Sequence, residues 1–141
     1  MARGIPKQVL DRLAELPVFR SCSQRELEAV AKIGTPIPIE PGYVLTRQGR
    51  RGHEFFVIVQ GEATCTIDDR QVARLGPGEF FGEMSLVEHD VQSATVVADT
   101  TMEVIAFDAR EFGAMLEQAP STARTLLGTV AHRLREAQSP R

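Results

Sequence analysis

The sequence predicts an α+β protein that is mainly β, with an antiparallel β-roll (a jelly-roll-like barrel) flanked by N-terminal and C-terminal helices. Apolar residues follow helical spacing near both ends of the chain, whereas residues 36–108 contain short apolar or alternating runs separated by turn signals. A length of 141 residues with 43% hydrophobic residues suits one globular domain. We therefore expect a single domain over 1–141, with N-terminal helices over 1–34, the β-roll over 36–108 and C-terminal helices over 109–138.

Two helices are expected before the sheet. The first has apolar residues at helical spacing and stops at a proline: Val9, Leu10, Leu13, Leu16 and then Pro17. In the second, Ser23 and Glu26 have the spacing of a capping box, in which a serine and a glutamate bond reciprocally to backbone N–H groups. Gly34 and Pro36 should end this helix.

The pattern of residues 36–108 predicts a series of short strands. Residues 55–59, with the sequence FFVIV, are apolar at every position, which is typical of a strand buried on both faces. In the following run, Ala63, Cys65 and Ile67 alternate with polar residues, so this strand should have one solvent-facing side.

Two further helices should close the chain. Asp108 and Glu111 form a second capping pair, and Pro120 is well placed to begin the last helix. Five apolar residues of that helix are expected on one stripe: Ala123, Leu126, Leu127, Val130 and Leu134. Periodicity alone leaves two interpretations open, packing on the domain's own barrel or a dimer interface.

Charge and composition argue against several functions. A net charge of −3 and a pI near 5.6 give no basic surface for nucleic acid, and the chain ends at Arg141 without room for a winged helix-turn-helix. We therefore expect no direct DNA binding.

The charged N-terminus resembles neither a signal peptide nor a membrane span, which indicates a cytoplasmic protein with no membrane contact. Cys22 and Cys65 should be reduced apolar fillers.

Enzymatic and metal chemistry find little support in the sequence. A metal-binding cupin barrel needs clustered histidines, whereas His53, His89 and His132 lie singly in different elements. The same isolation argues against haem ligation. We expect no enzyme activity, no metal and no required cofactor.

Two stretches carry a resemblance to a known family. PGYVLTRQGRRGHEFFVIVQGEA at 41–63 and GPGEFFGEMSLVEHDVQSATVVA at 76–98 contain its glycine spacing. With the flanking helices, they resemble the cyclic-nucleotide-binding domain family, of the catabolite activator protein and protein kinase A regulatory subunit type. The resemblance covers nearly the whole chain and implies a β-roll that carries a phosphate-binding cassette at residues 81–94.

The resemblance also implies the residues of a ligand site. They are Phe81, Gly82, Glu83, Met84, Ser85, Gln92, Ser93 and Ala94. In this family Glu83 would bind the ribose 2′-hydroxyl, Gly82 to Ser85 would form the helix start beneath a cyclic phosphate, and Ser93 would meet a phosphate oxygen. The family's phosphate-binding arginine falls on Gln92.

Gln92 offers amide donors but no charge, which should weaken phosphate binding by about 2–4 kcal/mol, or roughly 30- to 1000-fold. Between Leu75 and Ala109 the sequence has no lysine or arginine. A replacement cation would have to come from elsewhere, and the candidates are Arg47, Arg50, Arg51, Arg74 and a protonated His89.

Two functions follow as hypotheses. The leading one is a regulatory sensor that binds cAMP or a related nucleotide weakly or with altered selectivity, and whose last helix closes over the ligand. The alternative is a domain that has lost its ligand and acts as a dimerisation or protein-docking scaffold. In both, the last helix is the expected contact for a protein partner or a second copy.

Overall fold

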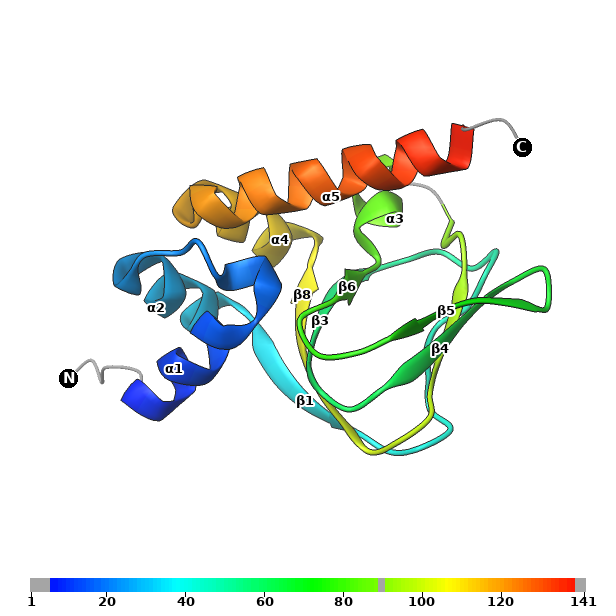
Figure 1. Ribbon diagram of the computed structural model, residues 1–141, viewed down its shortest axis with the longest axis horizontal. Helices are drawn as coiled ribbons and strands as arrows, with labels where there is room; N and C mark the ends of the chain where they lie inside the picture. The colour runs from blue at the N-terminus through cyan, green and yellow to red at the C-terminus, as the bar shows by residue number, and fades with distance from the viewer. Residues whose placement is uncertain (1–5, 89–90, 139–141) are drawn as a thin grey trace.

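The computed structural model describes residues 6–88 and 91–138, and two four-stranded sheets form its centre (Figure 1). The sheet orders are β1-β8-β3-β6 and β2-β7-β4-β5, and each pairing is antiparallel. The strands are β1 (Thr35–Ile39), β2 (Val44–Thr46), β3 (Glu54–Gln60), β4 (Ala63–Ile67), β5 (Arg70–Leu75), β6 (Phe80–Phe81), β7 (Thr95–Ala98) and β8 (Met102–Asp108). The predicted mainly β, antiparallel architecture is confirmed.

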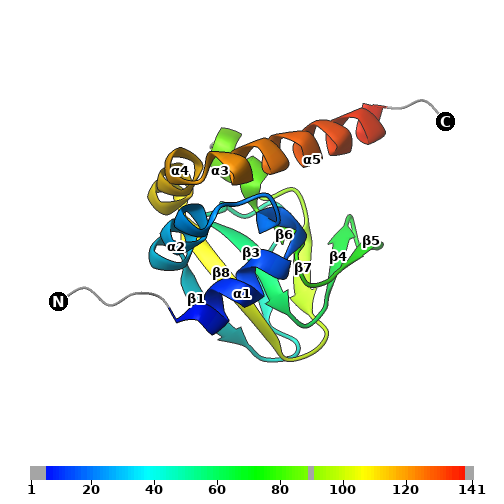
Figure 2. The same cartoon turned by 60° about the vertical axis from the view of Figure 1, so that its left-hand side comes forward.

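Helices precede and follow the strands of the roll in the sequence, and one short helix lies between β6 and β7. They are α1 (Lys7–Glu15), the 3-10 helix η1 (Pro17–Phe19), α2 (Gln24–Ile33), α3 (Glu83–Glu88), α4 (Ala109–Gln118) and α5 (Pro120–Gln138). Figures 1 and 2 both show α5 running across one end of the roll, with α3 between it and the strands. The N-terminal helices pack beside β1 and β8.

The predicted starts of two helices are confirmed by their caps. Ser23 precedes α2 and Asp108 precedes α4, and each forms a complete capping box with Glu26 or Glu111. In each box the cap side chain accepts from the backbone N–H three residues later, while the glutamate accepts from the cap's own N–H. Pro120 begins α5, where its missing N–H costs no hydrogen bond.

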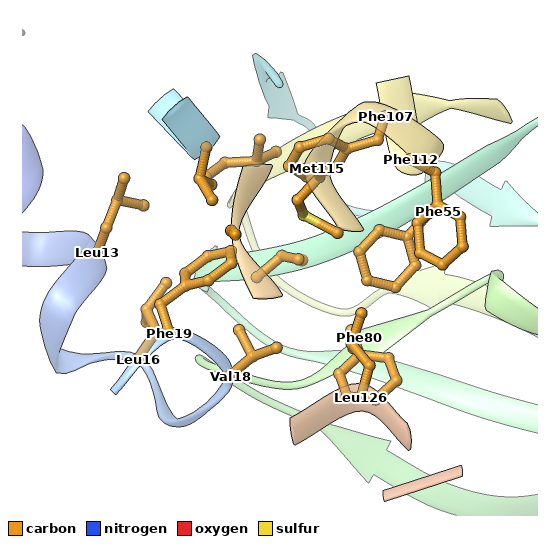
Figure 3. Packing of buried hydrophobic residues seen from close by; sticks show 14 of the residues in the cluster. Leu13, Leu16, Val18, Phe19, Phe55, Phe80, Phe107, Phe112, Met115 and Leu126 are labelled. Carbon is orange, nitrogen blue, oxygen red and sulfur yellow. The ribbon is translucent and has the colours of Figure 1, made fainter. Parts of the chain in front are cut away.

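Strand β3 separates two hydrophobic cores. Phe55 and Val57 face a cluster shared with the helices, whereas Phe56 and Ile58 face a cluster shared with the second sheet. Figure 3 shows the first cluster, in which the Phe55 ring lies 4.8 Å from the ring of Phe112, centroid to centroid. This position explains why the strand is apolar at successive residues, as its sequence predicted.

The expected alternation in β4 holds only at one end of the strand. Ala63 is fully buried, Cys65 is half-buried, and Ile67 is 37% exposed. The inner face of β4 becomes more open along the strand because Cys65 and Ile67 border a cavity instead of packed side chains.

The prediction of one apolar stripe on α5 is wrong in part. Leu126 is 5% exposed and belongs to the helical core, whereas the neighbouring Leu127 is 70% exposed. Successive helical residues are about 100° apart, so one can face the core while the next faces solvent. The side chain of Leu134 lies outside the described residues.

Candidate functional site

A cavity of about 500 Å³ lies between the inner face of the second sheet, the 81–94 segment and α5. Its apolar side is made by Cys65, Ile67, Ala73, Leu75, Val96 and, from α5, Val130. Its polar side is made chiefly by the segment that joins β6 to β7. A cavity of this size, apolar on one side with a few polar groups on the other, is typical of small-molecule sites.

Seven of the eight residues expected at the ligand site line this cavity. They are Phe81, Gly82, Glu83, Ser85, Gln92, Ser93 and Ala94. Met84 lies in α3, and its side chain is outside the described residues. The described part of the segment therefore borders the cavity, and residues 89–90, between α3 and β7, are outside the described residues.

Gly82 allows the chain to turn from β6 into α3. Its φ is 95°, in the left-handed region that residues other than glycine rarely adopt. A Cβ at this position would also collide with the carbonyl oxygen of Glu54 in β3. Glycine is thus required here both by conformation and by the close approach of two backbone segments.

Glu83, the first residue of α3, is 6% exposed although it carries a carboxylate. Its Oε2 accepts a hydrogen bond from Nη1 of Arg133 at 3.0 Å. Its Oε1 is buried and has no hydrogen-bond partner in the part of the chain that the structure describes. Leaving such an acceptor unpaired is costly, and it belongs to a residue that lines the cavity.

Arg133 of α5 supplies the guanidinium group of this site. Nη2 donates to the carbonyl oxygen of Phe80 at 3.3 Å, and the guanidinium carbon lies 4.6 Å from the centroid of the Phe80 ring. The group is therefore held by an ion pair, a backbone hydrogen bond and a cation–π contact. Its side chain is still 41% exposed and borders the cavity.

Arg133 is not among the residues predicted from the sequence. The signal was its position three residues after Val130, which places both side chains on one face of a helix. The candidates that were identified lie elsewhere: Arg74 pairs with Glu62 and Asp99, and His89 is outside the described residues. Arg47, Arg50 and Arg51 are exposed and do not line the cavity.

Gln92 is tied to the loop that follows β2. Its Oε1 accepts from the backbone N–H of Arg47 at 2.8 Å, and its own N–H donates to the carbonyl of Arg50 at 2.7 Å. Because a backbone N–H can only donate, the amide oxygen must be the atom that faces Arg47. The NH₂ group of Gln92 is then the end that remains available as a donor.

Smaller polar groups complete the polar side. Ser85 Oγ donates to the carbonyl of Gly82 at 3.1 Å, and the hydroxyl of Thr46 donates to the carbonyl of Ala94 at 3.0 Å. Burial raises the pKa of the Cys65 thiol above its ordinary value of 9.0, and the charge of Arg133 opposes this to a lesser extent. Cys65 thus presents an uncharged thiol to the cavity at neutral pH.

Metal chemistry has no visible site in the described ranges, 6–88 and 91–138. Within them, no three side chains of histidine, cysteine, aspartate or glutamate gather as metal ligands would. Both cysteines are free thiols and half-buried.

A comparison with known protein families identifies the family to which this fold and cavity belong. The model of the cyclic nucleotide-binding domain matches residues 36–119, from β1 to the end of α4. The chain belongs to the cyclic nucleotide-binding domain family.

Relatives of the chain include several regulatory proteins. A cyclic nucleotide-gated potassium channel of Rhizobium etli is 33% identical over 121 residues, which are 86% of this chain and 34% of the channel. The cAMP-dependent protein kinase regulatory subunit of Schizosaccharomyces pombe is 31% identical over 108 residues, which are 76% of this chain and 26% of that subunit. The chain thus spans about a third or less of these relatives.

A solved structure shares most of this architecture. The catabolite activator protein of Thermus thermophilus superposes with a TM-score of 0.79 at 29% identity, over 86% of this chain and 59% of that protein. Among the helices in the described ranges, none is long and apolar enough to cross a membrane.

Proposed function

We propose that this domain is a regulatory ligand sensor that binds a cyclic nucleotide in the cavity, with cAMP as the best candidate. The observation that carries the proposal is Glu83: this buried carboxylate lines the cavity, and its Oε1 has no hydrogen-bond partner among the described residues. An unsatisfied buried acceptor costs about 1–3 kcal/mol. A sugar hydroxyl that reaches Oε1 would supply the missing donor.

The remaining parts of a cyclic nucleotide match the two sides of the cavity. The phosphate would meet backbone N–H groups at the start of α3, the hydroxyl of Ser93 and the NH₂ group of Gln92. The base would lie against the apolar side, which includes Val96 and Val130. The relatives support this ligand class, since one is named as cyclic nucleotide-gated and another as a cAMP-dependent kinase subunit.

Binding would be signalled through α5. Val130 and Arg133 of this helix line the cavity, so a ligand that contacts them favours one position of α5 over others. A ligand shifts such an equilibrium only by the difference between its affinities for the two states. The output would then be read by a partner protein or by a second copy that contacts this helix.

The proposal is tested by measuring cAMP affinity by calorimetry for the wild type and for Gln92→Arg. Gln92 stands where we infer the family's arginine, so restoring the cation should raise affinity at least about tenfold. The matched control is Gln71→Arg, which adds the same charge at an exposed position of β5 and should leave affinity unchanged. Absence of cAMP binding in both the wild type and Gln92→Arg would refute the sensor.

A scaffold remains the second candidate, and the exposure of Leu127 favours it. Leu127, which is 70% exposed on α5, would be an apolar residue of the scaffold's contact, either with a partner protein or with α5 of a second copy. In this function the cavity would hold no ligand, and the contact through α5 would be constitutive.

Other predictions about the function stay proposals. We place the domain in the cytoplasm, acting through a protein partner instead of through DNA. We assign it no catalytic residue and no required cofactor. A wider thermal-shift screen with cyclic mono- and dinucleotides, ATP and haem would test the ligand class, because a ligand that binds the native state raises the melting temperature.

A further inference from the structure

The charges around the cavity do not suit an anion unless a cation takes part. Among the described residues that line it, the charged side chains are Glu79, Glu83 and Arg133. Glu79 is already bonded, since its Oε1 accepts from the backbone N–H of Gly76 at 2.7 Å. The two carboxylates alone would repel a phosphate, and Arg133 is the positive side chain among these described lining residues that can offset them.

We propose that Arg133 of α5 is the residue that recognises the negative charge of the ligand. This inference rests on the proposed function and names the group that replaces a cation at position 92. Gln92 itself cannot supply charge, because its amide is neutral and its oxygen is already held by the backbone of Arg47.

The guanidinium of Arg133 has donors to spare. Of the five N–H donors of an arginine, the structure shows Nη1 bonded to Glu83 and Nη2 bonded to the carbonyl of Phe80. The guanidinium carbon lies 4.6 Å from the centroid of the Phe80 ring, and Phe80 is itself only 4% exposed. Arg133 is thus oriented in advance and can bond an anion without first being ordered, which lowers the cost of binding.

The ion pair with Glu83 does not prevent this role. Glu83 Oε2 and a ligand oxygen can be bonded by different N–H groups of one guanidinium, which is a planar fork with several donors. The same ligand could then place a hydroxyl on Glu83 and its anionic oxygen on Arg133. The ligand class that fits is an anion with a sugar hydroxyl close to its phosphate.

The test is calorimetry with cAMP on the full chain. Arg133→Gln should weaken binding at least about tenfold, because charge-assisted hydrogen bonds are much stronger than neutral ones. Arg133→Lys keeps the charge but loses the planar fork that can bond Glu83 and the ligand together, so its affinity should fall between those of the wild type and Arg133→Gln. Arg135→Gln is the matched control: it removes an exposed arginine from the same helix and should change nothing.

A second pair of variants separates the lost charge from its effect on Glu83. Arg133→Gln leaves the buried carboxylate unpaired, whereas Glu83→Gln with Arg133→Gln leaves two neutral amides. The double variant should bind cAMP at least about tenfold more weakly than Glu83→Gln alone. This comparison keeps the inference testable even if the single Arg133→Gln variant is unstable.

The possible failures can be told apart. If the wild type does not bind cAMP, the proposed function falls and this inference falls with it. If cAMP binds equally well with and without the charge at position 133 in the Glu83→Gln background, only the inference falls. An increase in affinity in Arg133→Gln would also overturn it, since Arg133 would then be an internal competitor for Glu83.

Discussion

Two neighbouring residues of the 81–94 segment, Gly82 and Glu83, have features that are locally unfavourable for the fold. Gly82 must have a positive φ and must let the backbone of Glu54 come close, so any side chain would be strained. Glu83 next to it is buried, yet only one of its two oxygens is bonded among the described residues. Such local costs tend to occur where a protein binds something, because a bound ligand can repay them.

Gly82→Ala should destabilise the fold by at least about 2 kcal/mol, from left-handed strain and from the collision with the Glu54 carbonyl. Urea denaturation of purified variants would measure it. Gly113→Ala is the matched control, because Gly113 lies inside α4 and a Cβ added there would meet nothing within 4 Å. That variant should gain about 0.5–1 kcal/mol, since alanine favours a helix. Equal effects at the two glycines would contradict the argument.

Between elements, one side chain caps two helices. Glu26 completes the capping box of α2, and it also accepts hydrogen bonds from the backbone N–H and the hydroxyl of Ser121, both at 2.9 Å. Ser121 is in the first turn of α5, where N–H groups have no helical partner. Next to this joint, the Cys22 sulfur lies 3.0 Å from the hydroxyl of the fully buried Thr122. The N-terminal helices thus help to set the position of α5.

Glu26→Gln should therefore lower the free energy of unfolding more than Glu111→Gln does. The expected loss is about 1–2 kcal/mol for the shared cap and about 1 kcal/mol or less for Glu111, whose box is confined to α4. Chemical denaturation at neutral pH would compare them. Equal losses would mean that the bonds to Ser121 contribute nothing.

The same joint should depend on pH. Hydrogen bonds from Ser23 and Ser121 lower the pKa of Glu26 below its ordinary value of 4.5. Because the unfolded chain then binds this proton more readily, the stabilisation is complete above about pH 4.5 and is lost as the pH falls through the lowered folded value. The stability difference between the wild type and Glu26→Gln should shrink over that acid range. A constant difference down to low pH would contradict the assignment.

At the scale of the whole molecule, the two cores have different roles. The cluster around Phe55 joins the helices to the first sheet, and Figure 3 shows it continuing to Leu126 of α5. The cluster around Ile58 joins the two sheets and stops at the cavity. α5 is therefore fixed near its start by the first core, whereas Arg133 farther along holds it to the cavity wall.

If α5 is the contact for a second copy, Leu127→Lys should weaken dimerisation at least about tenfold, because it places a charge at the centre of an apolar contact. Sedimentation at several concentrations would measure the change. Val72→Lys is the control, since Val72 is also exposed, at 54%, but lies on β5. A wild-type chain that stays monomeric at all concentrations, or equal effects of the two variants, would argue against a dimer through α5.

Much of the fold could be predicted from the sequence because its signals are local. A capping box relates residues three apart, and a helix or strand shows its faces through a short period. Ser23 with Glu26, Asp108 with Glu111 and the apolar run of β3 therefore appeared in the sequence as they do in the structure. The cassette residues that line the cavity were named by family resemblance, which was carried by the glycine spacing.

Contacts between distant residues were decided by the tertiary structure alone. Arg133 meets Glu83 across 50 positions, and Glu26 meets Ser121 across 95. Whether Leu126 or Leu127 faces the core likewise depends on how α5 is rotated against the roll. Periodicity defines the faces of an element but not its neighbours, because neighbours are chosen by the packing of all the elements together. For that reason the contact of Arg133 with Glu83 beside the cavity became visible only in the folded molecule.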